Sequence, residues 1–147
     1  MEKTEQYRLL ERQVASLVEG ETDVIAKMAN IAAVLHETFG FWWTGFYRVV
    51  GDGLVLGPFQ GPVACMHIPY GKGVCGTAWK RNETVVVPDV EEFPGHIACS
   101  SASKSEIVVP VHGAGGEVVA VLDIDSDRLA TFDEEDRVWL ERIVTLL

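Results

Sequence analysis

The sequence predicts an α+β fold in which a central antiparallel sheet packs against helices from both ends of the chain. Apolar residues recur at helical spacing in both terminal segments, whereas the middle is rich in β-branched and aromatic residues and divided by glycine-rich turns. The 147 residues suffice for one domain. We therefore expect a single domain over 1–147, with helices in 1–38, the sheet and a pocket in 41–125, and a last helix in 133–147.

Two helices are expected at the start of the chain. The first covers residues 3–18, with an apolar stripe formed by Tyr7, Leu10, Val14, Leu17 and Val18. Gly20 ends it, and Thr22 or Asp23 can cap the second helix, which ends before Gly40. The apolar stripe of the second helix contains Val24, Ile25, Met28, Ile31, Ala32 and Leu35.

Strands, turns and one short helix follow. Residues 41–50 favour a strand, and Gly51-Asp52-Gly53 turns the chain into a returning strand. The remaining elements are expected to be strands over 54–59 and 65–69, a short helix over 74–80, a strand over 84–87, a long loop over 90–104, and a hairpin of 106–112 with 117–125. Asp133 caps the last helix, whose apolar residues are Val138, Leu140, Ile143, Val144 and Leu147. The long loop and the short helix should cover the sheet face opposite the terminal helices and leave a ligand pocket there.

The charge and hydropathy of the chain exclude several classes of partner. The formal net charge is −10 with histidines neutral, which argues against binding to nucleic acid or to an anionic membrane. No apolar run approaches the ~20 residues that cross a bilayer, and residues 1–5 lack the layout of a signal peptide. We therefore expect a cytoplasmic protein whose three cysteines are thiols at rest.

Two carboxylates share one side of the strand expected over 117–125. Because side chains alternate along a strand, Asp123 and Asp125 face the same way, about 6–7 Å apart at ~3.3 Å per residue. They either face solvent or cap the following turn, or they converge on a cation. Two carboxylates in a covered site repel each other unless a positive group lies between them, and the α-ammonium of a free amino acid would serve.

Glu106 leads into the apolar segment 107–111, on the strand expected to pair with the Asp123 strand. A glutamate among apolar neighbours can keep its proton near neutral pH and act as a general acid. The alternative is an ordinary charge at a strand edge.

The three cysteines leave the nucleophile open. Their spacing matches no zinc motif. Cys99 lies among small and polar loop residues, where a cysteine is more often reactive, and His96 nearby gives only a weak indication of a cysteine–histidine pair. Cys75 would lie in the first turn of a short helix, where the helix dipole favours a thiolate. Cys65, in a strand, is the best candidate for a structural thiol.

Aromatic residues crowd the first strand. Alternation puts Trp42 and Phe46 on one face and Trp43 and Gly45 on the other. One of these faces should belong to the core, and the other could line the pocket.

Six segments together resemble the free methionine-R-sulfoxide reductases, a family built on the GAF fold. Any one of them is a weak signal, but the set follows the family's order, and the chain has all three of the family's cysteines and all three of its acids. The segments are Trp43-Thr44-Gly45-Phe46-Tyr47, Leu56-Gly57-Pro58-Phe59-Gln60-Gly61, Gly71-Lys72-Gly73-Val74-Cys75-Gly76, Pro94-Gly95-His96-Ile97-Ala98-Cys99, Ser105-Glu106-Ile107-Val108 and Leu122-Asp123-Ile124-Asp125-Ser126.

The resemblance implies a role for each cysteine. Cys99 corresponds to the family's nucleophile, Cys65 to its usual resolving thiol, and Cys75 to an auxiliary or alternative one. Ser100 departs from the pattern, which usually carries an acid after the nucleophile, and this could alter the capping of the loop or the tuning of the nucleophile.

The resemblance also implies the substrate contacts. The acidic substrate residues correspond to Glu106, Asp123 and Asp125, the pocket tryptophan corresponds to Trp43, and Tyr47 lies in the matching motif. The implied reaction reduces free methionine-R-sulfoxide through a cysteine sulfenic acid and an intramolecular disulfide, which thioredoxin would reduce.

The same resemblance implies no metal and no organic cofactor, and it leaves a homodimer open. Two other functions stay open on the sequence alone. One is a non-catalytic GAF sensor of a small ligand, and the other is a redox switch that senses oxidant without a substrate.

Overall fold

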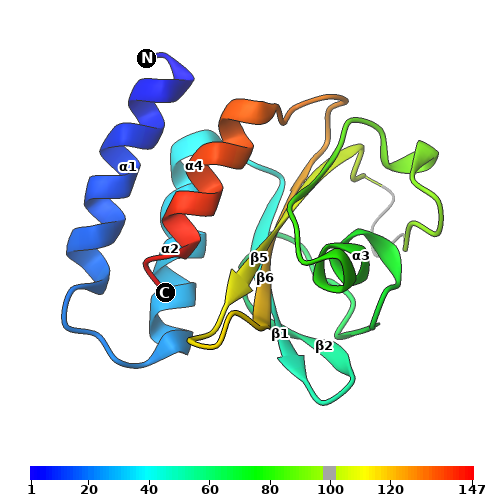
Figure 1. The fold of residues 1–147 in the computed structure, drawn as a ribbon. Coiled ribbons are helices and arrows are strands. Elements are labelled where there is room, and N and C mark those ends of the chain that lie inside the picture. Colours follow the sequence, from blue (N-terminus) through cyan, green and yellow to red (C-terminus); the bar gives the residue numbers. More distant parts are fainter. Residues whose placement is uncertain (98–101) are drawn as a thin grey trace.

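A six-stranded antiparallel sheet forms the centre of the molecule, with helices on both faces (Figure 1). The computed structural model describes residues 1–97 and 102–147. Helices α1, α2 and α4 lie on one side of the sheet, and α3 lies on the other. The helices span Lys3–Val18 (α1), Val24–Phe39 (α2), Gly73–Arg81 (α3) and Glu134–Val144 (α4), with a single 3₁₀ turn over Val90–Glu92 (η1).

The strands follow the order β3-β2-β1-β6-β5-β4 across the sheet. They span Trp43–Val50 (β1), Gly53–Gln60 (β2), His67–Pro69 (β3), Val85–Val87 (β4), Ser105–His112 (β5) and Val118–Ser126 (β6). The two long hairpins, β1–β2 and β5–β6, are joined through the pairing of β1 with β6 at the centre. The predicted α+β class and the order of the elements are therefore confirmed.

The helix ends follow from local side-chain chemistry. The side chain of Asp23 accepts hydrogen bonds from the backbone N–H groups of Ile25 and Ala26. Helix α2 ends at Phe39, and the next residue is Gly40, whose φ of 66° suits glycine. At the start of α4, Asp133 and Asp136 cap each other's backbone N–H groups in a reciprocal capping box. The expected caps at positions 23 and 133 are thus confirmed.

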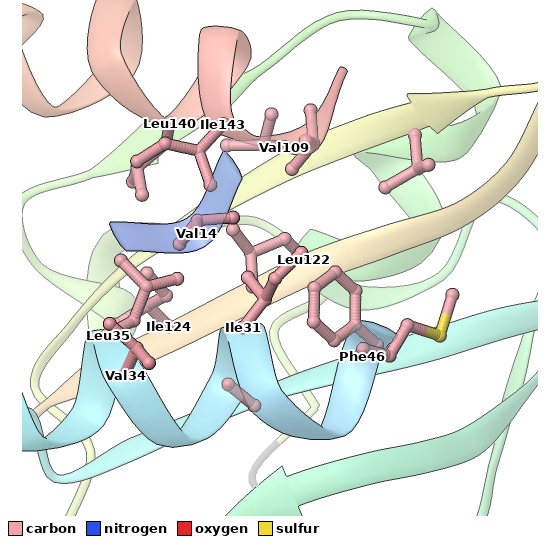
Figure 2. Close-up of a cluster of buried hydrophobic side chains, with 14 of the residues drawn as sticks. Val14, Ile31, Val34, Leu35, Phe46, Val109, Leu122, Ile124, Leu140 and Ile143 are labelled. Atoms are coloured by element: carbon pink, nitrogen blue, oxygen red, sulfur yellow. The ribbon is translucent and has the colours of Figure 1, made fainter. Parts of the chain in front are cut away.

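The main hydrophobic core lies between the sheet and the three helices α1, α2 and α4 (Figure 2). Along β6, Leu122 and Ile124 point toward these helices. The residues that alternate with them along the strand, Val121 and Asp123, face the other side of the sheet, as the two-residue period of a strand requires. The sheet therefore separates an apolar core from a second face that is free to carry chemistry.

A buried polar contact attaches α1 to α4. Asp136 is 2% exposed, and its Oδ1 accepts a 2.5 Å hydrogen bond from the Tyr7 hydroxyl. Its Oδ2 accepts a 2.8 Å hydrogen bond from Lys3 Nζ. A buried carboxylate is costly without partners, so these contacts fix how the first helix packs.

Three details of the prediction were wrong. The third strand begins at His67 rather than at residue 65. Val24 and Ile25, expected on the buried stripe of α2, are more than two fifths exposed, because the part of α2 that packs on the sheet begins at Met28. Leu17 and Val138 are likewise exposed on their helices.

Within the described residues, none of the helices has both the length and the apolar character needed to cross a membrane.

Candidate active site

A cavity lies between the second face of the sheet and helix α3. The space that the centres of water-sized molecules can occupy within it is about 50 Å³, and the cavity is open to solvent on one side. Its floor comes from β1, β5 and β6, and its walls come from the start of α3, from Val63 and Ala64, and from His96 and Ile97. The expectation that the long loop and the short helix leave a pocket over this face is confirmed.

Three acidic side chains lie together on the floor of the cavity. Glu106 on β5 pairs with Asp125 on β6, and Asp125 pairs on its other side with Trp43 on β1. Asp123 stands two residues before Asp125 on the same face and pairs with Gly45. We refer to Glu106, Asp123 and Asp125 as the acid cluster. The predicted shared face of the two aspartates is confirmed, and Glu106 joins them from the neighbouring strand.

The acid cluster is surrounded by apolar side chains. Glu106 is 6% exposed and Asp123 is 5% exposed. The buried residues on the same face of the sheet include Val87, Val108 and Val121. Transfer of a carboxylate from water to such surroundings disfavours its charged form, so the cluster is destabilised while it is ionised and unpaired.

Burial and mutual repulsion hold the acid cluster toward its protonated forms. Burial raises the pKa of Glu106 well above its usual range, and the charges of Asp123 and Asp125 raise it further. The pKa of Asp125 is also well above its ordinary value, first through burial and then through the charge of Asp123. Burial raises the pKa of Asp123, although hydrogen bonds from Glu106 and from the Cys75 thiol oppose that rise. The protonated form of Glu106 is therefore favoured inside the cavity.

One oxygen of the acid cluster lacks a partner within the described residues. Asp123 Oδ1 is buried and accepts no hydrogen bond there. Asp125 Oδ1 accepts a 3.3 Å hydrogen bond from the Ser103 hydroxyl. The sequence gives no sign of this contact, because nothing marks Ser103 among its loop neighbours. A buried acceptor without a donor is costly, so the cavity is suited to a ligand that brings N–H groups or a cation.

Cys75 corrects the expectation of a thiolate at the start of the short helix. It lies in the first turn of α3, but it is only 3% exposed. Burial raises the pKa of the Cys75 thiol well above its ordinary value, and the charges of Asp123, Glu106 and Asp125 raise it further. Desolvation and the neighbouring acid cluster oppose the helix dipole, so the protonated thiol form of Cys75 is favoured.

Cys65 also differs from its prediction. It lies in an irregular segment just before β3 and not within a strand, so its side-chain direction is not set by a pleat. Cys65 takes part in a disulfide. Its backbone carbonyl accepts a 2.8 Å hydrogen bond from the Tyr47 hydroxyl, which connects this cysteine to the cavity floor on β1. The strand position that made Cys65 the best candidate for a structural thiol was wrong.

Cys99 and Ser100 lie outside the described residues, so the expectations for them remain predictions. The residues on either side reach the cavity, since His96 and Ile97 precede the gap, Ser103 follows it, and all three line the cavity wall. Burial lowers the pKa of His96, which favours its neutral form. The cysteine–histidine pair considered from the sequence also remains untested.

Trp43 forms one side of the cavity and is held from several directions. Its ring stacks on Phe59 at 5.3 Å and lies 6.0 Å from Tyr47, and its Nε1 donates a 3.0 Å hydrogen bond to the Pro62 carbonyl. The ring lies directly over Gly45, where an added Cβ would come within 2.6 Å of the indole. Close packing, which no local motif reveals, therefore fixes this side chain.

The prediction for Trp42 was wrong. Trp42 was expected to share a face with Phe46, but it lines the cavity together with Trp43, whereas Phe46 is in the main core. Strand β1 begins at Trp43, so Trp42 precedes the strand and the alternation of its pleat does not apply. Two neighbouring tryptophans thus reach the same cavity.

The cavity floor also has the donor set of a metal site. The side-chain ligand atoms of Cys75, Glu106 and Asp123 lie within 4.8 Å of one another, and all three residues are buried. They come from α3, β5 and β6, so no spacing in the sequence brings them together.

Known proteins share both the sequence and the fold. Residues 19–147 match the family model described as GAF domain. The chain is 55% identical to GAF domain-containing protein A of Dictyostelium discoideum, over 99% of this chain and 92% of that protein. It is 47% identical to a protein of Escherichia coli (strain K12) named free methionine-R-sulfoxide reductase, over 100% of this chain and 89% of that one. Its fold matches an X-ray structure of free methionine-R-sulfoxide reductase from Neisseria meningitidis in complex with its substrate, with a TM-score of 0.97, 52% identity, and coverage of 99% of this chain and 88% of that one.

Proposed function

The chain belongs to the GAF-domain family and, within it, to the free methionine-R-sulfoxide reductases, and on this premise we propose that it reduces free L-methionine-R-sulfoxide to L-methionine. The observation that carries the proposal is the buried acid cluster on the floor of an aromatic-walled cavity. The named relatives indicate which substrate to consider. The geometry of the cavity gives a physical reason why that substrate should be a free amino acid.

The acid cluster selects the α-ammonium of the substrate. An ammonium group brings three N–H donors and a positive charge, which meets the unpartnered Asp123 Oδ1 and offsets the repulsion within the cluster. The nitrogen of a peptide-bound methionine is an uncharged amide with a single N–H. Such a residue would leave the buried carboxyl groups unpaired, and a site of this kind discriminates strongly against a ligand that lacks the expected donor.

The aromatic wall accommodates the apolar end of the substrate. Trp42, Trp43 and Tyr47 line one side of the cavity, and we assign the methyl group and side-chain methylenes to this side. Trp43 is 3% exposed and already held by its stacking partner and its hydrogen bond, so it offers a rigid surface at low entropic cost.

Cys99 is the nucleophile in this proposal. Its sulfur attacks the sulfoxide sulfur while Glu106, which keeps its proton because of burial, donates that proton to the sulfoxide oxygen. The sulfur–oxygen bond of the substrate breaks, methionine leaves, and Cys99 becomes a sulfenic acid. Two electrons pass from the cysteine to the substrate sulfur, and the oxygen is transferred to the cysteine.

Cys65 is the resolving thiol. It condenses with the Cys99 sulfenic acid, which forms the disulfide and releases water, and thioredoxin then reduces that disulfide by thiol exchange. Two facts support this choice over Cys75: Cys65 takes part in a disulfide, and Cys75 is a free, buried thiol. Cys75 is assigned an auxiliary role.

The proposed catalytic unit is one GAF domain that covers the whole of 1–147. The main core supports this proposal, because it contains residues of α1, α2 and α4 together with residues of the sheet. The N-terminal helix is further attached to α4 through Tyr7 and Asp136.

Substrate selectivity tests the proposal. Reduced protein is incubated separately with free methionine-R-sulfoxide, the free S epimer and a peptide that contains oxidised methionine, and the methionine produced is measured by chromatography. We expect turnover of the free R epimer alone. Equal turnover of all three substrates would contradict the role given to the acid cluster.

Cysteine variants separate the enzyme from a non-catalytic sensor. Cys99→Ser should abolish turnover, whereas Cys75→Ser should retain methionine formation in a single turnover. Binding of the sulfoxide by the wild type with no methionine produced would instead support a sensor. Mass mapping of the disulfide after one turnover distinguishes Cys65 from Cys75, and omission of thioredoxin from a multiple-turnover assay tests the recycling step.

A further inference from the structure

We propose that Cys75, Glu106 and Asp123 form a binding site for a thiophilic divalent cation such as Zn²⁺ on the floor of the cavity. The ion is not a cofactor of the proposed reaction. It is an inhibitor that competes with the substrate for the same carboxyl groups.

The geometry of the three side chains suits one small ion. Their ligand atoms already lie within 4.8 Å of one another. A tetrahedral Zn²⁺ with ligands at about 2.0–2.3 Å holds those ligands roughly 3.3–3.8 Å apart, so the three atoms need to approach one another by only about 1 Å. Rotamer adjustments of that size are available to side chains that border a cavity. The fourth position faces the cavity, where a water molecule can bind.

The unpartnered oxygen of Asp123 is a second and independent indication of a ligand. Asp123 is 5% exposed, lines the cavity, and keeps Oδ1 without a hydrogen-bond donor among the described residues. A native structure rarely leaves a buried acceptor unpaired, and an unpaired one usually marks a place for a water molecule or an ion.

The charge balance of the cavity favours a cation. Three carboxyl groups and one thiol lie on its floor, and none of the described residues that line it is a lysine or an arginine. His96 also lines the cavity and could carry a positive charge, but burial lowers its pKa and so favours its neutral form. An ion with two positive charges therefore meets no lysine or arginine among the described lining residues. Cys75 and Glu106 each release a proton to solvent as the metal binds.

The mixture of ligand atoms selects the kind of ion. A thiolate is a soft ligand that favours Zn²⁺ and similar metals, whereas Mg²⁺ and Ca²⁺ prefer six or more oxygen ligands, counting water. Two carboxylates and one thiolate therefore favour Zn²⁺ over the more abundant Mg²⁺. Co²⁺ accepts the same geometry and reports thiolate binding by its absorption.

Zinc binding is tested on protein in which the disulfide of Cys65 is intact, because Cys75 is then the free thiol among the described cysteines. A thiol titration of one per chain confirms that state. Zn²⁺ affinity is measured by competition with a chromophoric chelator, and Co²⁺ is added in parallel. We expect one ion per chain, a thiolate-to-cobalt charge-transfer band, and no displacement of Zn²⁺ by millimolar Mg²⁺.

Matched variants locate the ion. Cys75→Ser should remove the charge-transfer band, and both Cys75→Ser and Asp123→Asn should weaken Zn²⁺ binding by about 100-fold, since loss of a direct ligand costs at least as much as loss of an outer partner. His112→Ala is the control, because His112 is an exposed imidazole that contacts Asn82 away from the cavity. Circular dichroism checks that each variant is folded. Zinc affinity that falls in His112→Ala but not in Cys75→Ser would overturn the proposal.

Inhibition of the reductase by Zn²⁺ rests on the proposed function, whereas binding of Zn²⁺ to the cavity floor does not. If the protein reduces methionine sulfoxide, Zn²⁺ should raise the KM for the sulfoxide and leave kcat unchanged. Zinc binding without any reductase turnover would refute the proposed function alone. Turnover with no zinc binding at the floor of the cavity would refute this inference alone.

Discussion

Gly45→Ala should displace the Trp43 ring, which forms one side of the cavity, because the ring packs directly on Gly45. An added Cβ at this position would lie 2.4 Å from Phe59 Cβ and 2.6 Å from Trp43 Cη2. Ordinary contacts of this kind begin near 3.4 Å, so each neighbour must retreat by about 1 Å. Phe59 Cβ is fixed to the backbone of β2, which pairs with Gly45 itself, and therefore strands β1 and β2 have to separate.

The expected cost follows from this overlap. Forcing an extra methyl group into a well-packed site destabilises a protein by about 1–3 kcal/mol. For a chain of this size, such a loss corresponds to a fall in melting temperature of roughly 2–12 °C. The displaced Trp43 ring moves toward the cavity, so the KM for the sulfoxide should rise as well. Urea unfolding gives the stability change, and steady-state kinetics give the KM.

Gly115→Ala is the matched control. Its added Cβ would also meet a close neighbour, but that neighbour is the carboxylate end of Glu117, which can rotate away on a flexible side chain. The control should unfold within about 0.5 kcal/mol of the wild type, as surface substitutions usually do. If Gly45→Ala were as stable as Gly115→Ala and equally active, the argument from close packing around the indole would be refuted.

Three further perturbations test separate parts of the structure. The folded state holds a proton on Glu106 that the unfolded chain releases. The stability measured by urea unfolding should therefore fall as the pH rises from about 4.5 toward the higher pKa of the folded state. Glu106→Gln should weaken this dependence. Tyr7→Phe removes a donor from buried Asp136 and should lower the free energy of unfolding by about 1–3 kcal/mol, with activity retained well below the melting temperature. Tyr47→Phe removes the hydrogen bond to the Cys65 carbonyl, worth about 1 kcal/mol, and should slow disulfide formation roughly fivefold in rapid-quench experiments while the first turnover still yields methionine.

Each of these expectations has a contrary result. A stability that rises with pH over that interval would mean that the acid cluster is ionised and paired in the folded state. A Tyr7→Phe variant as stable as the wild type would show that Asp136 finds another donor. Equal rates of disulfide formation in Tyr47→Phe and wild type would remove Tyr47 from the positioning of the resolving cysteine.

Strand periodicity made much of the cavity floor predictable. Asp123 and Asp125 had to share a face once their segment was taken as a strand, and Glu106 followed because its strand was expected to pair with theirs. Alternation failed at Trp42, because the sequence does not show where β1 begins, and a shift of one residue at a strand end reverses the face.

The protonation of Cys75 could not be predicted from its neighbours in sequence. Its position in the first turn of α3 is a local property, and that position alone favours a thiolate. The carboxyl groups that raise the pKa of Cys75 come from β5 and β6, and tertiary packing brings them close to its thiol. The proposed metal-binding cluster was not predicted for the same reason, since it combines one residue from each of three elements.

Two hydrogen bonds from aromatic side chains connect the proposed substrate site to the segment before β3, which carries Cys65. Trp43 and Tyr47 line the cavity, and their polar atoms donate hydrogen bonds to the carbonyls of Pro62 and Cys65. Under the proposed function, replacing either ring by a smaller side chain to admit a bulkier substrate would also release the segment that carries the proposed resolving cysteine. Variants with an altered substrate range should then reoxidise at a different rate, unless a second change anchors this segment again.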